Sequence, residues 1–326
     1  MKITLFFALL MTSISLIGQD NWYVDDQPQE LGDVHWLRNY DEALATSEKQ
    51  GLPVFILFQE VPGCHTCTTY GNKILQHPFI VELIETHFVP LAIYNNKGGE
   101  DRKVLQKYRE PSWNNPVVRI TNNKGDDLIN RVAGDYSLLG LTRGIQQAMI
   151  LSGQTTPAYL DIFLEELEGQ GQEEEAFLSM YCFWTGEKEI AKIDGVLSTE
   201  AGFMHGREVV KVTYNSDKTN LNQIAKKAER VSCADQVFAN QKGKEVDKGV
   251  GKYRQDREVK YYLSKSSYRS IPMTPLQSAK VNSAIGQGQN ALQYLSPRQI
   301  ELMNHVSNEN RIGEDFVSAW HKVVKS

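Results

Sequence analysis

Hydrophobic and polar positions divide the chain into two regions with different orders of elements. From residue 19 to residue 153, short apolar runs alternate with helix-like patterns. The predicted order is helix, strand, helix, strand, helix, strand, strand, helix, which is typical of an α/β domain with a mixed-direction sheet covered on both faces. The helices are expected at 36–49, 74–86, 102–108 and 138–151, and the strands at 53–58, 88–94, 116–120 and 128–132.

Residues 154–175 are interpreted as a linker, and residues 176–326 as a second domain. A Gly/Pro break and a polar run rich in Gly, Gln and Glu flank a helical stretch at 158–167. The pattern of the second domain is α+β. Strands are expected at 176–181, 196–203 and 208–214, and helices near Trp184, at 221–230, at 274–285 and in pieces over 296–325.

The first 18 residues have the pattern of a secretory signal peptide. One Lys precedes an apolar run over 3–17, and cleavage is expected after Gly18; an uncleaved N-terminal anchor is the alternative. No later apolar run is long enough to span a bilayer. We therefore expect an exported protein, periplasmic or secreted, without stable membrane insertion once the signal is removed.

Composition limits the classes of partner and the role of the cysteines. The formal net charge is -5 and no block of Lys or Arg stands out, so nucleic acid is not an expected partner. A small exported scaffold stapled by disulfides carries more cysteines in proportion to its length. The scarcity indicates that the thiols do chemistry: they are Cys64, Cys67, Cys182 and Cys233.

Cys64 and Cys67 follow a predicted buried strand and precede a helix. At that place, backbone N–H groups and the helix dipole favour a thiolate. Two thiols with this spacing form and break a disulfide with little backbone movement; the upstream thiol attacks and the second resolves the mixed disulfide. His65 lies between them, and we hypothesise that its positive charge lowers the pKa of Cys64 further.

The cysteine pair lies in a motif found in a known family. Residues 61–64 read Val-Pro-Gly-Cys, and Cys67 closes the loop. Over about residues 30–151 the chain resembles thioredoxin-like proteins with a Val-Pro-Gly-Cys/Sec-x-x-Thr/Cys redox loop. The resemblance implies a thioredoxin-like fold, a redox role for both cysteines, and a cis-proline facing them, for which Pro116 is placed. A structural disulfide and a zinc half-site are the alternatives, although zinc needs further ligands and no second Cys-x-x-Cys occurs.

Cys182 lies at a second predicted turn from a strand into a helix, where a thiolate is again favoured. Phe183 and Trp184 follow at once. Two large aromatic rings beside a thiol can enclose a small uncharged group such as a methyl. The alternative is that both rings belong to the core.

Several segments of this half resemble peptide methionine sulfoxide reductase A. The resemblance covers about residues 176–280 and implies a ferredoxin-like α+β fold. The segments read Tyr-Cys-Phe-Trp-Thr-Gly-Glu at 181–187, Gly-Val-Leu-Ser-Thr-Glu-Ala-Gly-Phe at 195–203, Glu-Val-Val-Lys-Val-Thr-Tyr-Asn at 208–215 and Pro-Met-Thr-Pro-Leu-Gln at 272–277.

The resemblance also implies a role for each matching residue. Cys182 would attack the sulfoxide sulfur, while Phe183 and Trp184 hold the methyl group. Glu208 would protonate the departing oxygen, although it could also be a solvated charge at a strand end. The remaining matches are Asp256 and Tyr261, which keep the spacing of the family's oxygen-binding pair, whereas Tyr181 and Thr185 stand where the family has glycine.

The chemistry of sulfoxide reduction agrees with this set of residues. The reaction needs a soft nucleophile and a proton donor, because oxide is a poor leaving group. The nucleophile ends as a sulfenic acid, which a second thiol condenses into a disulfide. Cys233 is expected to be that thiol, and a buried apolar role is its alternative. The Cys64–Cys67 pair would then reduce the disulfide, since fusion of the domains raises the effective concentration of reductant.

Together these patterns predict an exported, thiol-dependent peptide-methionine (S)-S-oxide reductase that carries its own thioredoxin-like reductant domain. One alternative is a thiol–disulfide oxidoreductase whose second domain is a degenerate, non-catalytic binding module. Another is a binding protein in which the first cysteine pair is structural. The expected partners are oxidised proteins or peptides and an external thiol reductant, and no cofactor or metal is expected.

Overall fold

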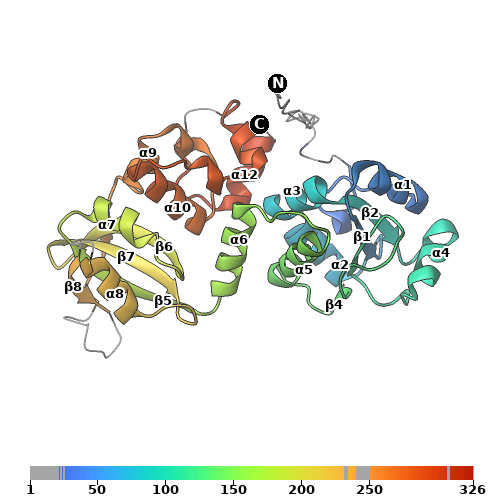
Figure 1. Ribbon diagram of the computed structural model, residues 1–326, viewed down its shortest axis with the longest axis horizontal. Coiled ribbons are helices and arrows are strands. Elements are labelled where there is room, and N and C mark those ends of the chain that lie inside the picture. The colour runs from blue at the N-terminus through green and yellow to red at the C-terminus, as the bar shows by residue number, and fades with distance from the viewer. Residues whose placement is uncertain are drawn as a thin grey trace, which may run out of the picture.

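The computed structural model describes residues 22, 24, 26–230, 234–239, 250–306 and 309–325. The predicted signal peptide, residues 1–18, lies outside these ranges. Two sheets lie in separate lobes at opposite ends of the molecule, with helix α6 (Ala158–Gly169) between them (Figure 1). Within the described ranges, no helix combines the length and the apolar content that crossing a membrane requires.

The first lobe is built on a sheet of mixed direction, in the order β2-β1-β3-β4. β1 (Val54–Gln59) is parallel to β2 (Val89–Tyr94) and antiparallel to β3 (Val117–Thr121), which pairs with β4 (Val132–Ala133). Every side chain of β1 is buried, because the strand has a neighbour on each side and apolar clusters on each face. The mixed direction confirms the prediction, but the strand expected at 128–132 is reduced to the short β4.

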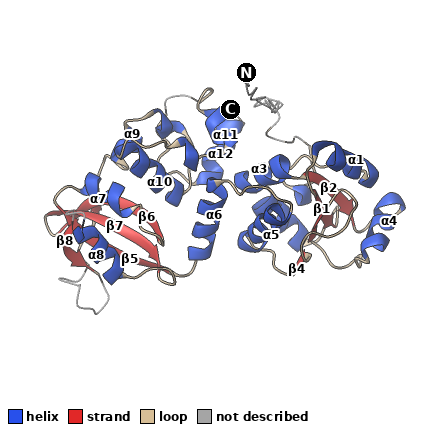
Figure 2. Cartoon of the chain, viewed as in Figure 1, coloured by secondary structure: helices blue, strands red, loops and turns tan. Residues whose placement is uncertain are grey.

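Helices cover both faces of this sheet, as predicted (Figure 2). α1 (Tyr40–Gln50) and α4 (Gly99–Tyr108) pack on one face. α3 (Pro78–His87) and α5 (Leu138–Leu151) pack on the other face.

The first helix begins later than the pattern of apolar residues predicts. The expected start was residue 36, whereas the Asn39 side chain caps α1 by accepting a hydrogen bond from Glu42 N. The residues before the cap extend the edge of the sheet instead, because Leu37 forms a bridge with Leu91 of β2.

The helix expected to follow the first cysteine pair begins within the pair: α2 (His65–Tyr70) contains Cys67 and continues into a π-helical turn at Gly71–Leu75. This turn includes residues 74 and 75, the first two residues of the helix predicted over 74–86. α3 begins instead at Pro78, since the fixed φ of proline suits the first helical position.

The second lobe has an antiparallel sheet in the order β8-β5-β7-β6-β9. Its main elements alternate as strand, helix, strand, strand, helix, strand, and the spatial order is that of the ferredoxin-like arrangement. The elements are β5 (Glu173–Met180), α7 (Phe183–Ile190), β6 (Val196–Met204), β7 (Arg207–Asn215), α8 (Leu221–Arg230) and β8 (Ala234–Phe238), with β9 (Arg254–Gln255) added at the edge. α7 and α8 bury their apolar sides on one face of the sheet.

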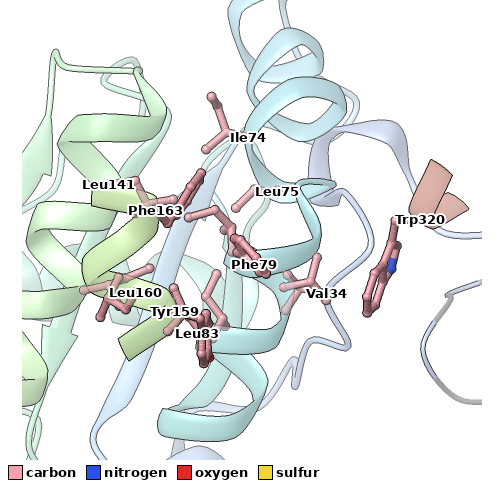
Figure 3. Packing of buried hydrophobic residues seen from close by; sticks show 14 of the residues in the cluster. Val34, Ile74, Leu75, Phe79, Leu83, Leu141, Tyr159, Leu160, Phe163 and Trp320 are labelled. Atoms are coloured by element: carbon pink, nitrogen blue, oxygen red, sulfur yellow. The ribbon is translucent and has the colours of Figure 1, made fainter. Parts of the chain in front are cut away.

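Among the described residues, four α-helices follow this sheet: the first two pack on α7 of the second lobe, and the last two contact α3 of the first lobe. They are α9 (Tyr261–Ser264), α10 (Pro275–Gly286), α11 (Pro297–Leu302) and α12 (Phe316–Val324). One buried cluster joins Phe79 of α3 with Phe163 of α6 and Phe316 of α12. Figure 3 shows Phe79, Tyr159 and Phe163 meeting there, with Trp320 farther along the same cluster.

Polar contacts reinforce the junction. The backbone N–H of Arg298 donates to Glu82 (2.9 Å), and its guanidinium binds Glu85. His321 of α12 lies 3.2 Å from Asp33. The segment interpreted as a linker therefore contains α6, a helix packed against both lobes, whose apolar residues recur at helical spacing between its polar flanks.

Candidate functional site

The first thiol pair lies where β1 passes into α2. Cys64 is the N-cap residue of α2 and is exposed, whereas Cys67, one turn later, has 0% of its surface exposed. The two Sγ atoms are 3.7 Å apart. This places one reactive sulfur at the surface and a second sulfur directly behind it.

The two thiols have opposite shifts in pKa. The pKa of Cys64 is lowered, first by the backbone N–H of Cys67 and also by the Cys67 thiol and the N–H of Thr66. Burial raises the pKa of Cys67 to about 12. Cys64 can therefore attack as a thiolate, whereas Cys67 stays protonated until it is needed to resolve a mixed disulfide.

Buried polar groups hold this turn in place. The Cys67 thiol donates to Asn115 Oδ1 (2.7 Å), and the Asn115–Pro116 peptide bond is cis. The N–H of Gly63 donates to the buried Glu30 carboxylate (2.7 Å). Sequence reasoning found Pro116 but missed Glu30 and Asn115, which lie far from the cysteines along the chain.

His65, which was expected to lower the pKa of Cys64, contacts Thr69 in the structure. His65 is exposed, and its Nε2 lies 3.5 Å from Thr69 Oγ1, one turn along α2. The groups that lower the pKa of Cys64 belong to the backbone and to Cys67.

The second site gathers around the start of α7. Cys182 is the N-cap residue of this helix and is partly exposed. The N–H of Phe183 donates to Glu208 Oε2 (3.0 Å). Trp184 donates from Nε1 to Asp256 Oδ2 (3.3 Å) and stacks on Tyr261, with ring centroids 4.0 Å apart.

The strands of the second sheet explain why these residues meet. The β6–β7 hairpin places Glu208 opposite Phe203, whose ring contacts Phe183 (centroids 5.3 Å apart). Asp256 follows β9, and its N–H donates to Ala201 of β6 (2.9 Å). Phe183 is also a buried member of the core cluster, whereas Trp184 is only partly buried.

A buried ion pair joins the two segments that carry Trp184 and Tyr261. Lys260 Nζ lies 3.1 Å from Glu187 Oε1, and it also donates to the Thr199 hydroxyl (3.1 Å). Both charged side chains are almost fully buried, and burial raises the pKa of Glu187. Glu187 matched the family motif, but nothing in the sequence pattern identified Lys260 as its partner.

Comparisons with known proteins address the first lobe. Residues 35–122 match the family model for "Thioredoxin-like" proteins. This part of the chain is a thioredoxin-like domain. No curated protein sequence matches the chain.

Two solved structures match part of the chain. A thioredoxin from Thermus thermophilus is 22% identical and covers 37% of this chain and 90% of its own, with a TM-score of 0.32. The DsbH oxidoreductase is 18% identical and covers 39% of this chain and 92% of its own, with a TM-score of 0.32.

The predicted site residues therefore fall into two groups. Cys64, Cys67 and Pro116 lie in the thioredoxin-like domain, while the residues around Cys182 meet in the other lobe. Cys233, predicted to resolve Cys182, lies outside the described residues, directly before β8.

Proposed function

We propose that the protein reduces methionine S-sulfoxide in oxidised proteins or peptides at Cys182, with electrons from its thioredoxin-like domain. One observation carries the proposal: the residues that the resemblance assigns to the reaction meet around the start of α7. They are Cys182, Phe183, Trp184, Glu208, Asp256 and Tyr261. These residues come from four separate segments of the chain. Contacts among them support the roles that the sequence resemblance assigns.

The proposed reaction begins with attack by the Cys182 sulfur on the sulfoxide sulfur. Glu208 delivers a proton to the oxygen, which passes to Cys182, so the products are the methionine thioether and a Cys182 sulfenic acid. Glu208 is held for this role by its bond to the Phe183 N–H, which fixes the carboxylate beside the residue that follows Cys182.

A second thiol then condenses with the sulfenic acid, releasing water and forming a disulfide. We propose Cys233 for this step. Cys64 attacks that disulfide, and Cys67 displaces the product, leaving a Cys64–Cys67 disulfide for an external thiol reductant to open. The opposite pKa shifts of Cys64 and Cys67 suit this order of steps.

One observation favours a second candidate, a thiol–disulfide oxidoreductase whose other lobe only binds clients. Trp184 uses its ring face on Tyr261 and its N–H on Asp256, the residues assigned to substrate oxygen. In addition, Tyr181, with 95% of its surface exposed, stands beside Cys182 where the reductase family has glycine. A binding lobe of this kind would retain the contacts without turnover.

An assay with dithiothreitol distinguishes the two candidates, because this reductant regenerates Cys182 without the other domain. The full chain is expected to consume methionine S-sulfoxide, and Cys182→Ser is expected to abolish turnover. Cys64→Ser is the matched control and should retain turnover with dithiothreitol. Turnover that is unaffected by Cys182→Ser, or absent from the unmodified protein, would rule out the reductase.

We also propose that the chain is exported, on the pattern of its first 18 residues. Expression with and without these residues, followed by fractionation of the cells, tests this proposal. Retention of the full-length chain inside the cell would contradict it.

A further inference from the structure

A carboxylate lies beside the first thiol pair. One ligand atom each from Glu60, Cys64 and Cys67 lies within 4.8 Å of the others. The Sγ–Sγ separation of 3.7 Å is much longer than the ~2.05 Å of a disulfide bond. It is close to the ~3.8 Å expected between two thiolates bound at ~2.3 Å to one tetrahedral zinc ion. The reduced pair therefore already has the spacing of a chelate.

The loop that carries these ligands is held from several sides. The Asn96 side chain accepts from Val61 N (3.3 Å) and donates to Pro62 O (3.2 Å). Gly63, the next residue, donates to Glu30. Because Glu60 and Cys64 stand at the two ends of this fixed loop, their separation does not depend on a flexible segment.

The chemistry of the three groups also suits a cation. Two thiols and a carboxylate offer one ligand atom each, and all three atoms lie within 4.8 Å of one another. One cation could therefore contact all three groups. A thiol-rich site with one carboxylate selects a borderline or soft ion over Mg²⁺ or Ca²⁺.

We propose that Glu60, Cys64 and Cys67 form a reversible site for one Zn²⁺-like cation in the reduced protein. On binding, Cys64 and Cys67 each release their thiol proton to solvent, Cys67 gives up its hydrogen bond to Asn115, and no atom changes oxidation state. Three protein ligands leave a fourth position open to water. Because both sulfurs are then coordinated, the ion blocks thiol–disulfide exchange. This site is independent of any reaction at Cys182.

The test uses the reduced full chain without oxygen, with Co²⁺ as a coloured substitute for Zn²⁺. One equivalent of Co²⁺ should give thiolate-to-metal absorption, and Zn²⁺ should displace it. Cys64→Ser should abolish the absorption, whereas Cys182→Ser, which removes the thiol of the other lobe, should not change it. Absorption that survives in Cys64→Ser would overturn the proposal.

A pair of Glu→Gln variants tests whether Glu60 is a ligand. Glu60→Gln keeps the shape of the side chain and is expected to weaken Zn²⁺ binding about tenfold or more, because even a change in an outer-shell partner of a metal typically costs about 10–100-fold. Glu229→Gln, at an exposed position on α8, is the matched control. As a second readout, Zn²⁺ should slow alkylation of Cys64 in the unmodified protein more than in Glu60→Gln. Equal affinities, or equal protection, would show that Glu60 is not a ligand.

Discussion

The indole of Trp184 and the ring of Tyr261 stack with their centroids 4.0 Å apart and their planes inclined by 16°. The two residues lie on α7 and at the start of α9, and the neighbouring residues Glu187 and Lys260 form a buried ion pair. The stack and the ion pair therefore fix the same two segments against each other, directly beside Cys182.

Removal of Lys260 tests how far this ion pair holds the second site. Lys260→Met should lower the free energy of unfolding by about 3–5 kcal/mol, because Glu187 would keep a buried charge without a partner. Denaturant unfolding measures this loss. The double variant Lys260→Met/Glu187→Leu should recover most of it, and failure to recover would mean that the two charges act separately.

The second prediction concerns Asn115. Its Oδ1 accepts the Cys67 S–H, a donor that exists only when the pair is reduced. The Asn115 side chain also donates to Ser112 O (3.4 Å), a contact that both redox forms would lose. Asn115→Ala should therefore destabilise the reduced protein by about 1 kcal/mol more than the oxidised protein.

Urea unfolding with and without a reductant compares the two forms. The same change should make the disulfide harder to reduce, since only the reduced side of the equilibrium loses the bond from the Cys67 thiol. Equal destabilisation of both forms would contradict the assigned contact.

Alkylation as a function of pH tests the contrast between the two thiols. Because the pKa of Cys64 is lowered, its thiolate should form below the pH at which an ordinary cysteine ionises, near 8.5. Cys67, with a pKa raised to about 12, should stay unreactive over the same range. Mass spectrometry after timed treatment with iodoacetamide assigns the label, and equal rates at both sites would contradict this order.

The junction between the lobes should respond to pH through Glu166 of α6. Burial raises its pKa to about 7, although it accepts a hydrogen bond from Leu276 N (2.7 Å). The folded state therefore holds this proton more tightly than the unfolded state, whose pKa is about 4.5. Stability should fall as the pH rises between these values, by up to ~3 kcal/mol.

Glu166→Gln removes the ionisation and keeps the side-chain shape, so it should abolish this part of the pH dependence. Unfolding curves measured at several pH values provide the comparison. An unchanged slope in the variant would assign the dependence to other groups.

Local patterns were sufficient to predict most elements. β1 reads as an apolar run because both of its faces are covered, and α8 matches the predicted 221–230 because its apolar residues recur at helical spacing. The strands and helices in the N-terminal half of the second lobe were likewise predicted from the sequence, because their apolar patterns follow one another in chain order. Caps and sheet-edge bridges, such as Asn39 and Leu37, shifted boundaries that periodicity alone could not place.

Contacts between distant segments could not be predicted from pattern. α6 looked like part of a linker because polar runs flank it, yet α10 and the first lobe cover its apolar side. Asn115, Glu30 and Lys260 carry no motif of their own, and each acquires its role from a partner brought close by folding. The residues around Cys182 were accessible to sequence reasoning only because a family resemblance named them.

A single-turnover experiment tests the central claim most directly. One equivalent of methionine S-sulfoxide is added to the fully reduced chain without oxygen or any other reductant, and methionine and disulfides are quantified by mass spectrometry. We expect about one equivalent of methionine together with a Cys64–Cys67 disulfide, and neither product in Cys182→Ser. Recovery of the sulfoxide unchanged, with all thiols still reduced, would contradict the proposal that the two lobes form one electron-transfer enzyme.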